Sequence, residues 1–172
     1  MTAVQDSPRP ALVCVPTPLG RYLVIAARGD EIAGSEFVHR RPRSAGSTEA
    51  LRGASAVVLR EARRQVEAYF SRRLERFSLP LAFCGTPFEC GVWRQVAALA
   101  FGEFVSYADV ARAVGRPLSH RGVARAMGRS QFALFVPAHR VVGADGKPRG
   151  LTPRGTRARL IAFEKQVANW TR

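Results

Sequence analysis

Cysteine, lysine and long apolar runs are scarce in this sequence of 172 residues. The three cysteines, Cys14, Cys84 and Cys90, form no CxxC pair, and their odd number argues against a disulfide framework and against a zinc site. This usage fits a reducing cytoplasm. No apolar run approaches the ~20 residues of a membrane-spanning helix, and the first residues lack the pattern of a secretory signal. We therefore expect a cytoplasmic protein with no membrane partner and no bound metal.

Acidic residues are few as well: the sequence has 13 of them against 27 lysines and arginines, and its net charge is +14. All the basic residues except Lys147 and Lys165 are arginines. From Thr86 onward there are 14 basic and 5 acidic residues, against 13 and 8 before that point. A polyanion such as nucleic acid would exploit a basic excess concentrated in one half of a chain. An arginine-biased genome that produces a soluble basic surface explains the composition equally well.

The first half of the sequence predicts a small sheet covered by a helix. Two strands are expected around residues 21–27 and 32–38, joined by a turn at 28–30, and the polar segment 39–50 is expected to be a mobile loop. Residues 54–74 then place apolar side chains at helical spacing, with arginines opposite. The apolar positions are Val58, Ala62, Val66 and Tyr69. A composition that is 47% hydrophobic allows one ordinary domain or two small ones with a real core.

The second half of the sequence predicts three helices, over residues 87–102, 106–115 and 119–128. Ser106 and Ser119 are the expected N-caps of the last two, and Ser106 has an acidic residue three positions later, as in a capping box. These two short helices and the tight turn between them resemble a helix-turn-helix, whose second helix enters a groove of DNA, although short capped pairs also occur in proteins that bind no DNA. Five arginines on or near the pair favour DNA: Arg112, Arg116, Arg121, Arg125 and Arg129.

Four side chains around the first of these helices are expected to be structural. Cys84 ends the apolar extended connection 78–85, and we expect its thiol to be buried. No histidine lies near Cys84 or Cys90 in the sequence, so neither is expected to act as a nucleophile. Trp93 and Phe88 are expected in the core rather than stacked on the bases of a nucleic acid.

The stretch VPAHRVVG, residues 136–143, surrounds an alanine with residue types that carry chemistry. His139 and Arg140 follow a proline and precede two valines and a glycine, so we expect a constrained turn that ends an extended segment. The position before His139 suits a nucleophile, because a cysteine near a histidine that a carboxylate orients is an activated thiolate. Ala138 occupies this position and can attack nothing. A lone histidine is more often structural than catalytic, and both roles stay open for His139.

Four segments together resemble the O6-alkylguanine-DNA alkyltransferase family: GTPFECGVW, GEFVSYADVARAVGRP, VPAHRVVG and the closing AFEK. The resemblance implies an α/β fold with a small N-terminal α/β domain, a ribonuclease-H-like sheet plus helix, over residues 1–84. A mainly helical DNA-binding domain with a helix-turn-helix would follow over 85–172. It also implies a monomer without a cofactor, whose partner is double-stranded DNA containing O6-alkylguanine, with the target nucleotide rotated out of the duplex.

The same resemblance assigns roles around the turn. The family motif is Pro-Cys-His-Arg-Val, and its cysteine takes the alkyl group from O6 of guanine irreversibly. Ala138 occupies the acceptor-cysteine place, His139 the place of the base, and Glu164 that of the carboxylate that orients the histidine. Arg140 matches the structural arginine of the motif. With PAHRV in place of PCHRV, the chain resembles the alkyltransferase-like proteins, which bind alkylated DNA without repairing it.

Residues that would act on the DNA are also implied by the resemblance. Tyr107 matches the tyrosine that crowds the phosphate 3′ to the target and helps to rotate the nucleotide out. Arg121 matches the arginine that enters through the minor groove and fills the vacated stack. The full set of expected DNA-binding residues is Ser106, Tyr107, Arg121, Arg125, Ala126 and Arg140.

The expected lesion pocket departs from the family pattern. Ser130 replaces an asparagine, Leu151 replaces the tyrosine that stacks on the base, and Pro153 and Arg154 replace a flexible glycine pair. A single engineered change would not bring these along, so they indicate natural loss of alkyl transfer with DNA binding kept. The pocket is expected to be lined by Met127, Ser130, Val136, Pro137, Ala138 and Leu151.

Three functions stay open at this point. The first is a non-catalytic protein that binds O6-alkylguanine and flags it for other repair, with nucleotide excision repair proteins as partners. The second is a true methylated-DNA–protein-cysteine methyltransferase in which Ala138 has replaced the acceptor cysteine. The third is a general DNA-binding protein with no lesion preference, because Leu151 removes a stacking platform and Pro153 and Arg154 reshape the pocket.

Overall fold

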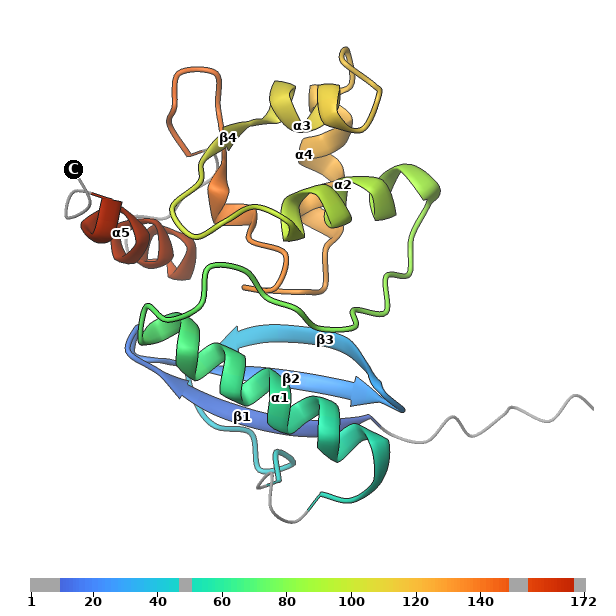
Figure 1. The fold of residues 1–172 in the computed structure, drawn as a ribbon, viewed down its shortest axis with the longest axis vertical. Helices are drawn as coiled ribbons and strands as arrows, with labels where there is room; N and C mark the ends of the chain where they lie inside the picture. Colours follow the sequence, from blue (N-terminus) through green and yellow to red (C-terminus); the bar gives the residue numbers. More distant parts are fainter. Residues whose placement is uncertain (1–9, 47–50, 149–154, 169–172) are drawn as a thin grey trace, which may run out of the picture.

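The computed structural model describes residues 10–46, 51–148 and 155–168 of the chain. Three antiparallel strands form a sheet in the order β1-β2-β3 (Figure 1): β1 (Ala11–Thr17), β2 (Arg21–Arg28) and β3 (Glu31–Val38). The two strands that the sequence predicts are confirmed as β2 and β3. Strand β1 is an addition to that prediction, and it tolerates Pro16 because an edge strand can lack one backbone donor.

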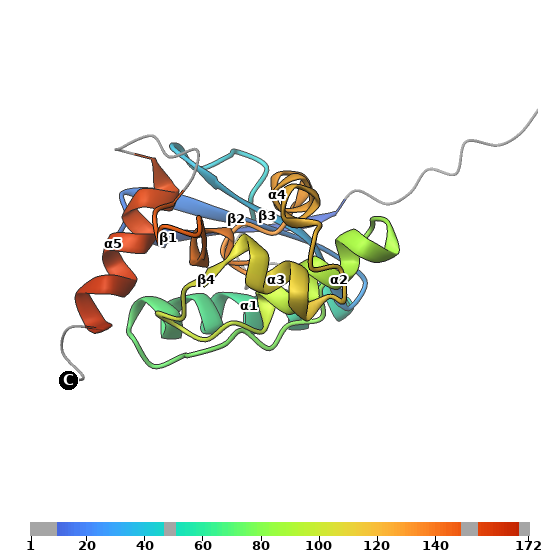
Figure 2. The same ribbon diagram turned by 90° about the horizontal axis from the view of Figure 1, so that it is seen from above.

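Helix α1 (Gly53–Phe70) lies along one face of this sheet, as both views show (Figure 1, Figure 2). The side chains at the predicted helical spacing are all buried, namely Val58, Ala62, Val66 and Tyr69. They pack against Val13, Leu23 and Ile25, which point to the same face of the sheet. Complete burial of a valine or leucine side chain contributes roughly 1.5–3 kcal/mol to the stability of the fold. The contact between α1 and the sheet therefore supplies much of the core.

Helix α2 (Pro87–Ala97) begins with a capping box between Thr86 and Glu89. The sequence predicts that this helix continues to Gly102. It ends at Ala97 instead, because the next residues form a tight turn. Gly102 has a left-handed φ of +74°, which favours glycine, and the Ala100 amide donates to the Glu103 carboxylate at 2.7 Å. The prediction that Trp93 lies in the core is confirmed: it is 3% exposed, and its Nε1 donates to the Ala126 carbonyl. Phe88 is half-buried and packs against the same core.

The predicted helix pair is present as α3 (Tyr107–Ala113) and α4 (His120–Arg129). The Ser106 capping box is confirmed: its hydroxyl accepts from the Asp109 amide, and the Asp109 carboxylate accepts from the Ser106 amide. Gly115, with a φ of +70°, follows the end of α3. Ser119 does stand at the N-cap of α4, but the prediction that it caps the helix is wrong, since its side chain makes no capping hydrogen bond.

Two short strands link this helix pair to the PAHRV turn. Strand β4 (Val105–Ser106) pairs in parallel with β5 (Val141–Val142), and the chain then continues into α5 (Thr156–Ala168). In Figure 1 the sheet and α1 form one layer, α2, α3 and α4 form the other, and α5 flanks them. The two layers are joined by backbone hydrogen bonds, from Ser35 to the Gln131 carbonyl and from Ala133 to the Ser35 carbonyl. The α/β fold class is thus confirmed, while the boundary at residue 85 stays a prediction.

In the described residues, no helix is both long and apolar enough to cross a membrane. Residues 47–50, which belong to the predicted loop, lie outside the described residues, as do Leu151, Pro153 and Arg154.

Candidate functional site

The PAHRV motif forms a one-turn 3-10 helix, η1 (Ala138–Arg140), as expected of a constrained turn. The segment before it is a turn and not the extended segment that the sequence suggests, and Leu134 there has a left-handed φ of +72°. Strand β5 follows η1 directly, and it pairs Val142 with Ser106. This pairing brings Tyr107, the first residue of α3, close to the turn.

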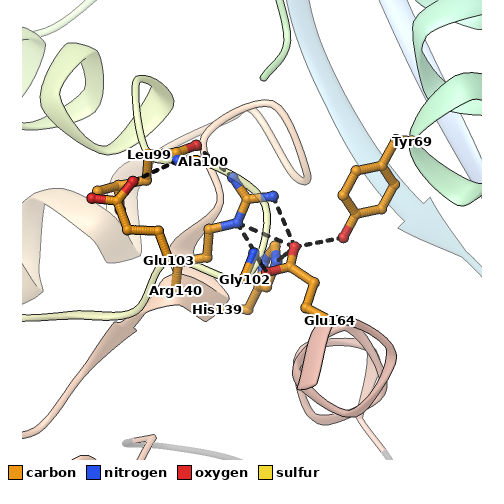
Figure 3. Close-up of polar contacts among 8 residues, drawn as sticks. All are labelled: Tyr69, Leu99, Ala100, Gly102, Glu103, His139, Arg140 and Glu164. Atoms are coloured by element: carbon orange, nitrogen blue, oxygen red, sulfur yellow. Dashed lines mark hydrogen bonds and ion pairs between the residues drawn. The ribbon is translucent and has the colours of Figure 1, made fainter. Parts of the chain in front are cut away.

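The carboxylate of Glu164 is the centre of a buried polar cluster (Figure 3). Its Oε1 is 2.8 Å from His139 Nε2 and accepts a hydrogen bond of 2.7 Å from the Tyr69 hydroxyl. The guanidinium of Arg140 donates to both carboxylate oxygens at 2.8–3.1 Å. The Gly102 amide donates to Oε2 at 3.1 Å. Glu164 is 0% exposed, so every one of these donors compensates for lost hydration.

Burial and pairing set the charges in this cluster. Burial alone would raise the pKa of Glu164, but hydrogen bonds from His139 and Arg140 hold that pKa at about 2. Burial lowers the pKa of His139 below its usual range, and the hydrogen bond to Glu164 opposes this shift without reversing it. Burial also raises the pKa of Tyr69. At neutral pH the cluster therefore holds one carboxylate, one guanidinium and a neutral imidazole.

A neutral His139 that donates through Nε2 keeps Nδ1 as a proton acceptor. This is the state that a general base next to a thiol would need, and Ala138 supplies no thiol. Arg140 is 1% exposed, and besides Glu164 it donates to the Leu99 carbonyl at 2.6 Å. Its side chain thus connects the turn, α5 and the segment after α2. This geometry supports a structural role for Arg140 and contradicts the expectation that it contacts DNA.

Arg157 also holds the turn in place, although no motif of the sequence predicted this role. Its guanidinium donates to the carbonyls of Ala138 and Val141 at 2.7 and 2.8 Å and lies 3.5 Å from the Tyr107 hydroxyl. Arg157 and Glu164 are seven residues apart, a spacing that puts both on one face of α5. That spacing is the signal by which Arg157 could have been found.

A groove of about 1230 Å³ opens at the turn. Of the predicted pocket residues it is lined by Met127, Ser130, Val136 and Ala138, whereas Pro137 is not in its wall. The groove continues over the face of the sheet that is turned away from α1, where Leu12, Val24 and Ala26 line it. Cys84 lines the groove too and is exposed, so the prediction that it is buried is wrong. Among the described residues, no three His, Cys, Asp or Glu side chains are close enough to hold a metal.

The expected DNA-binding residues divide into two groups. Arg121 and Arg125 are exposed on α4, and Tyr107 is half-buried at the start of α3. Ser106 is half-buried, and its hydroxyl is engaged in the capping box. Ala126 is 2% exposed and faces the core, so the expectation that its side chain reaches DNA is wrong.

The exposed arginines of the helix pair lie in a region without counter-charges. No acidic residue occurs between Asp109 and Asp145. Among the described residues, Arg116, Arg121 and Arg125 take part in no ion pair, whereas Arg112 pairs with Asp109 and Arg129 with Glu89. Uncompensated guanidinium groups on one helix pair are suited to phosphate oxygens.

Residues 87–166 match the family described as "6-O-methylguanine DNA methyltransferase, DNA binding domain". The methylated-DNA–protein-cysteine methyltransferase of Mycolicibacterium paratuberculosis is 34% identical over 138 residues, which cover 79% of this chain and 80% of the relative. That of Methanosarcina barkeri is 45% identical over 91 residues, and the match spans 53% of this chain and only 58% of the relative. The crystal structure of Mycobacterium tuberculosis OGT in complex with DNA superimposes with a TM-score of 0.73 at 28% identity, covering 91% of this chain and 93% of that one. The chain belongs to the O6-methylguanine-DNA methyltransferase family.

Proposed function

We propose that this chain binds double-stranded DNA at O6-alkylguanine, rotates the lesion out of the duplex and holds it without taking the alkyl group. The observation that carries this proposal is Ala138 at the acceptor position of an otherwise assembled site. The histidine, the carboxylate and the turn that would serve a nucleophile are all in place, but a methyl group stands where the sulfur would be. A lesion held at this site would meet no nucleophile and would therefore keep its alkyl group.

Tyr107 and Arg121 support the rotation of a nucleotide. A purine O6 inside a duplex is out of reach, so recognition requires an extruded base and a side chain that fills the stack. Tyr107 lies next to the turn through the β4–β5 pairing, and Arg121 is exposed on α4 without an acidic partner among the described residues. These positions support the roles that we propose for Tyr107 and Arg121.

Ser130, Leu151 and the pair Pro153–Arg154 support natural loss of transfer. Ser130 lines the groove beside Ala138, and its hydroxyl accepts a weak hydrogen bond of 3.4 Å from the Phe132 amide. All these positions depart from the family pattern together with the acceptor. We infer that the bound protein, acting as a monomer, persists on the lesion as a mark that nucleotide excision repair proteins then recognise.

The test is binding to matched duplexes with and without one O6-methylguanine, at equal salt, together with a transfer assay using a labelled methyl group. We expect the lesion duplex to bind tighter by on the order of tenfold or more, and the label to stay in the DNA. Equal affinity for the two duplexes would leave the third function, a general DNA-binding protein. Label on the protein would establish an enzyme.

The intact pair of His139 and Glu164 favours a second candidate, a methyltransferase in which Ala138 has replaced the acceptor cysteine. The Ala138→Cys variant distinguishes the two. Under the first proposal the pocket has changed elsewhere, and this variant transfers no methyl group. Transfer by Ala138→Cys, lost again in Ala138→Cys/Glu164→Gln, would show that the rest of the site is competent and would favour the second candidate.

A further inference from the structure

The turn between α3 and α4 presents a leucine to solvent. Leu118 is 92% exposed, and the other exposed large hydrophobic side chain of the described residues is Val57, on α1, at 63%. In Figure 1 this turn lies at the outer end of the helix pair, away from the sheet. A single exposed apolar residue is common on proteins, so its meaning depends on how it is held and on what surrounds it.

Backbone hydrogen bonds define the turn that carries Leu118. The Ser119 amide donates to the Arg116 carbonyl at 2.9 Å and closes a four-residue turn, with Pro117 and Leu118 as its central residues. Pro117 fixes its own φ. The Arg116 amide donates in turn to the Ala111 carbonyl at 2.9 Å, which anchors the turn to the end of α3. The backbone at Leu118 is therefore part of a hydrogen-bonded turn, and the side chain projects from this turn into solvent.

Leu118 is flanked in the sequence by positive charge. Arg116 and Arg121 are both exposed, and the sequence has no acidic residue between Asp109 and Asp145. Arg121 follows Leu118 by three residues, in the first turn of α4. An apolar tip set among cations fits a groove whose walls are sugars and whose rims are phosphates.

We infer that Leu118 is an apolar wedge that enters the minor groove beside Arg121 and packs against the deoxyribose and base edges that flank the vacated stack. This inference rests on the proposed function. Minor-groove proteins commonly insert such side chains and unstack the neighbouring base step. The leucine leaves water when the groove closes over it, so it supplies affinity that does not depend on salt, next to the salt-dependent arginine contacts.

The experiment compares Leu118→Ala and Leu118→Ser with Val57→Ser in the full chain. The probes are duplexes with and without O6-methylguanine, each carrying 2-aminopurine beside the target guanine to report unstacking. We expect Leu118→Ser to lose on the order of tenfold in affinity for the lesion duplex, because a buried leucine side chain is worth at least that factor. The 2-aminopurine signal should fall with it, the slope of affinity against salt should stay unchanged, and Val57→Ser should bind as the wild type does.

Wild-type affinity and fluorescence in Leu118→Ser would overturn the wedge, and so would a loss of affinity that appears only as a shallower salt dependence. Leu118 is almost fully exposed, so equal melting temperatures are expected and any fold defect would be visible. A wild-type protein without lesion preference would contradict the proposed function instead. In that case the undamaged duplex still tests the role of Leu118 as a wedge: the affinity of Leu118→Ser for this duplex must be lower than that of Val57→Ser.

Discussion

The Tyr69 hydroxyl, on α1, donates a hydrogen bond of 2.7 Å to the Glu164 carboxylate, on α5, across 95 residues of sequence. Tyr69 also packs against the rings of Phe101 and Phe163. The helix that covers the sheet is thus tied to the helix that carries the carboxylate of the site. The first half of the chain therefore contributes a side chain directly to the buried cluster of the site.

Replacing Tyr69 by phenylalanine keeps the ring packing and removes one donor from a buried carboxylate. A hydrogen bond to a charged group is worth about 1.5–3 kcal/mol, and we expect the free energy of unfolding to fall by that amount. Tyr22→Phe is the matched control, because the described part of the chain offers its hydroxyl no hydrogen-bond partner. Urea unfolding of both variants measures the difference, and equal stability would show that Glu164 does not depend on Tyr69.

Stability should fall as the pH drops below about 6.5, the ordinary pKa of histidine. The pKa of His139 is lowered in the folded protein, so between its folded and unfolded pKa values the unfolded chain binds the extra proton. The stabilisation from the neutral imidazole is therefore complete above pH 6.5 and is lost as the pH falls, by at most about 1.4 kcal/mol per pH unit. Below pH 4.5 a second loss of stability follows, because the pKa of Glu164 is lowered in the folded protein and the unfolded chain takes up this proton first. This loss continues down to about pH 2.

His139→Gln should be less stable than the wild type at pH 7.5 and should show a flatter dependence on pH between 4.5 and 6.5. The exposed His120 supplies the control, since His120→Gln removes a histidine outside the cluster. Denaturant unfolding at intervals of half a pH unit gives both slopes. A wild-type slope that persists in His139→Gln would assign the pH dependence to another group.

Most of the fold could be predicted from local patterns in the sequence. The spacing of apolar residues in α1 and the Ser106 capping box depend on neighbours in sequence, and both were predictable. The end of α2 was not, because distant groups engage the backbone after Ala97: the Leu99 carbonyl accepts from Arg140 and the Gly102 amide donates to Glu164.

In the candidate site too, the sequence predicted the residues of the local motif but not the contacts between distant segments. The motif and its resemblance pointed to His139 and Glu164, which the structure brings to 2.8 Å. Tyr69 was expected only as a core residue and Arg157 not at all, since their polar contacts join segments 95 and 19 residues apart. Cys84 was misplaced because an apolar segment suggests burial, while its exposure depends on how the connection crosses the groove.

The two serines before α3 and α4 provide a paired test of capping. Ser106 accepts from the Asp109 amide, whereas the Ser119 side chain makes no capping bond. Ser106→Ala should therefore lower the free energy of unfolding by about 1 kcal/mol. Ser119→Ala should change it by less than about 0.5 kcal/mol. Thermal and urea unfolding measure both variants, and an equal effect would mean that Ser106 stabilises the protein in some other way.

Arg121 and Arg125 lie one turn apart on α4, and both are exposed, so their alanine variants remove the same charge from neighbouring sites. Arg125→Ala should weaken binding to damaged and undamaged duplexes alike and reduce the salt slope by about one, as expected for a lost phosphate contact. Arg121→Ala should instead lower the ratio of the two affinities, because the arginine that fills the vacated stack acts only when a base is rotated out. Titrations at three salt concentrations separate the two effects. If Arg121→Ala kept the wild-type ratio and lost only salt dependence, Arg121 would be a phosphate contact and another side chain would have to fill the stack.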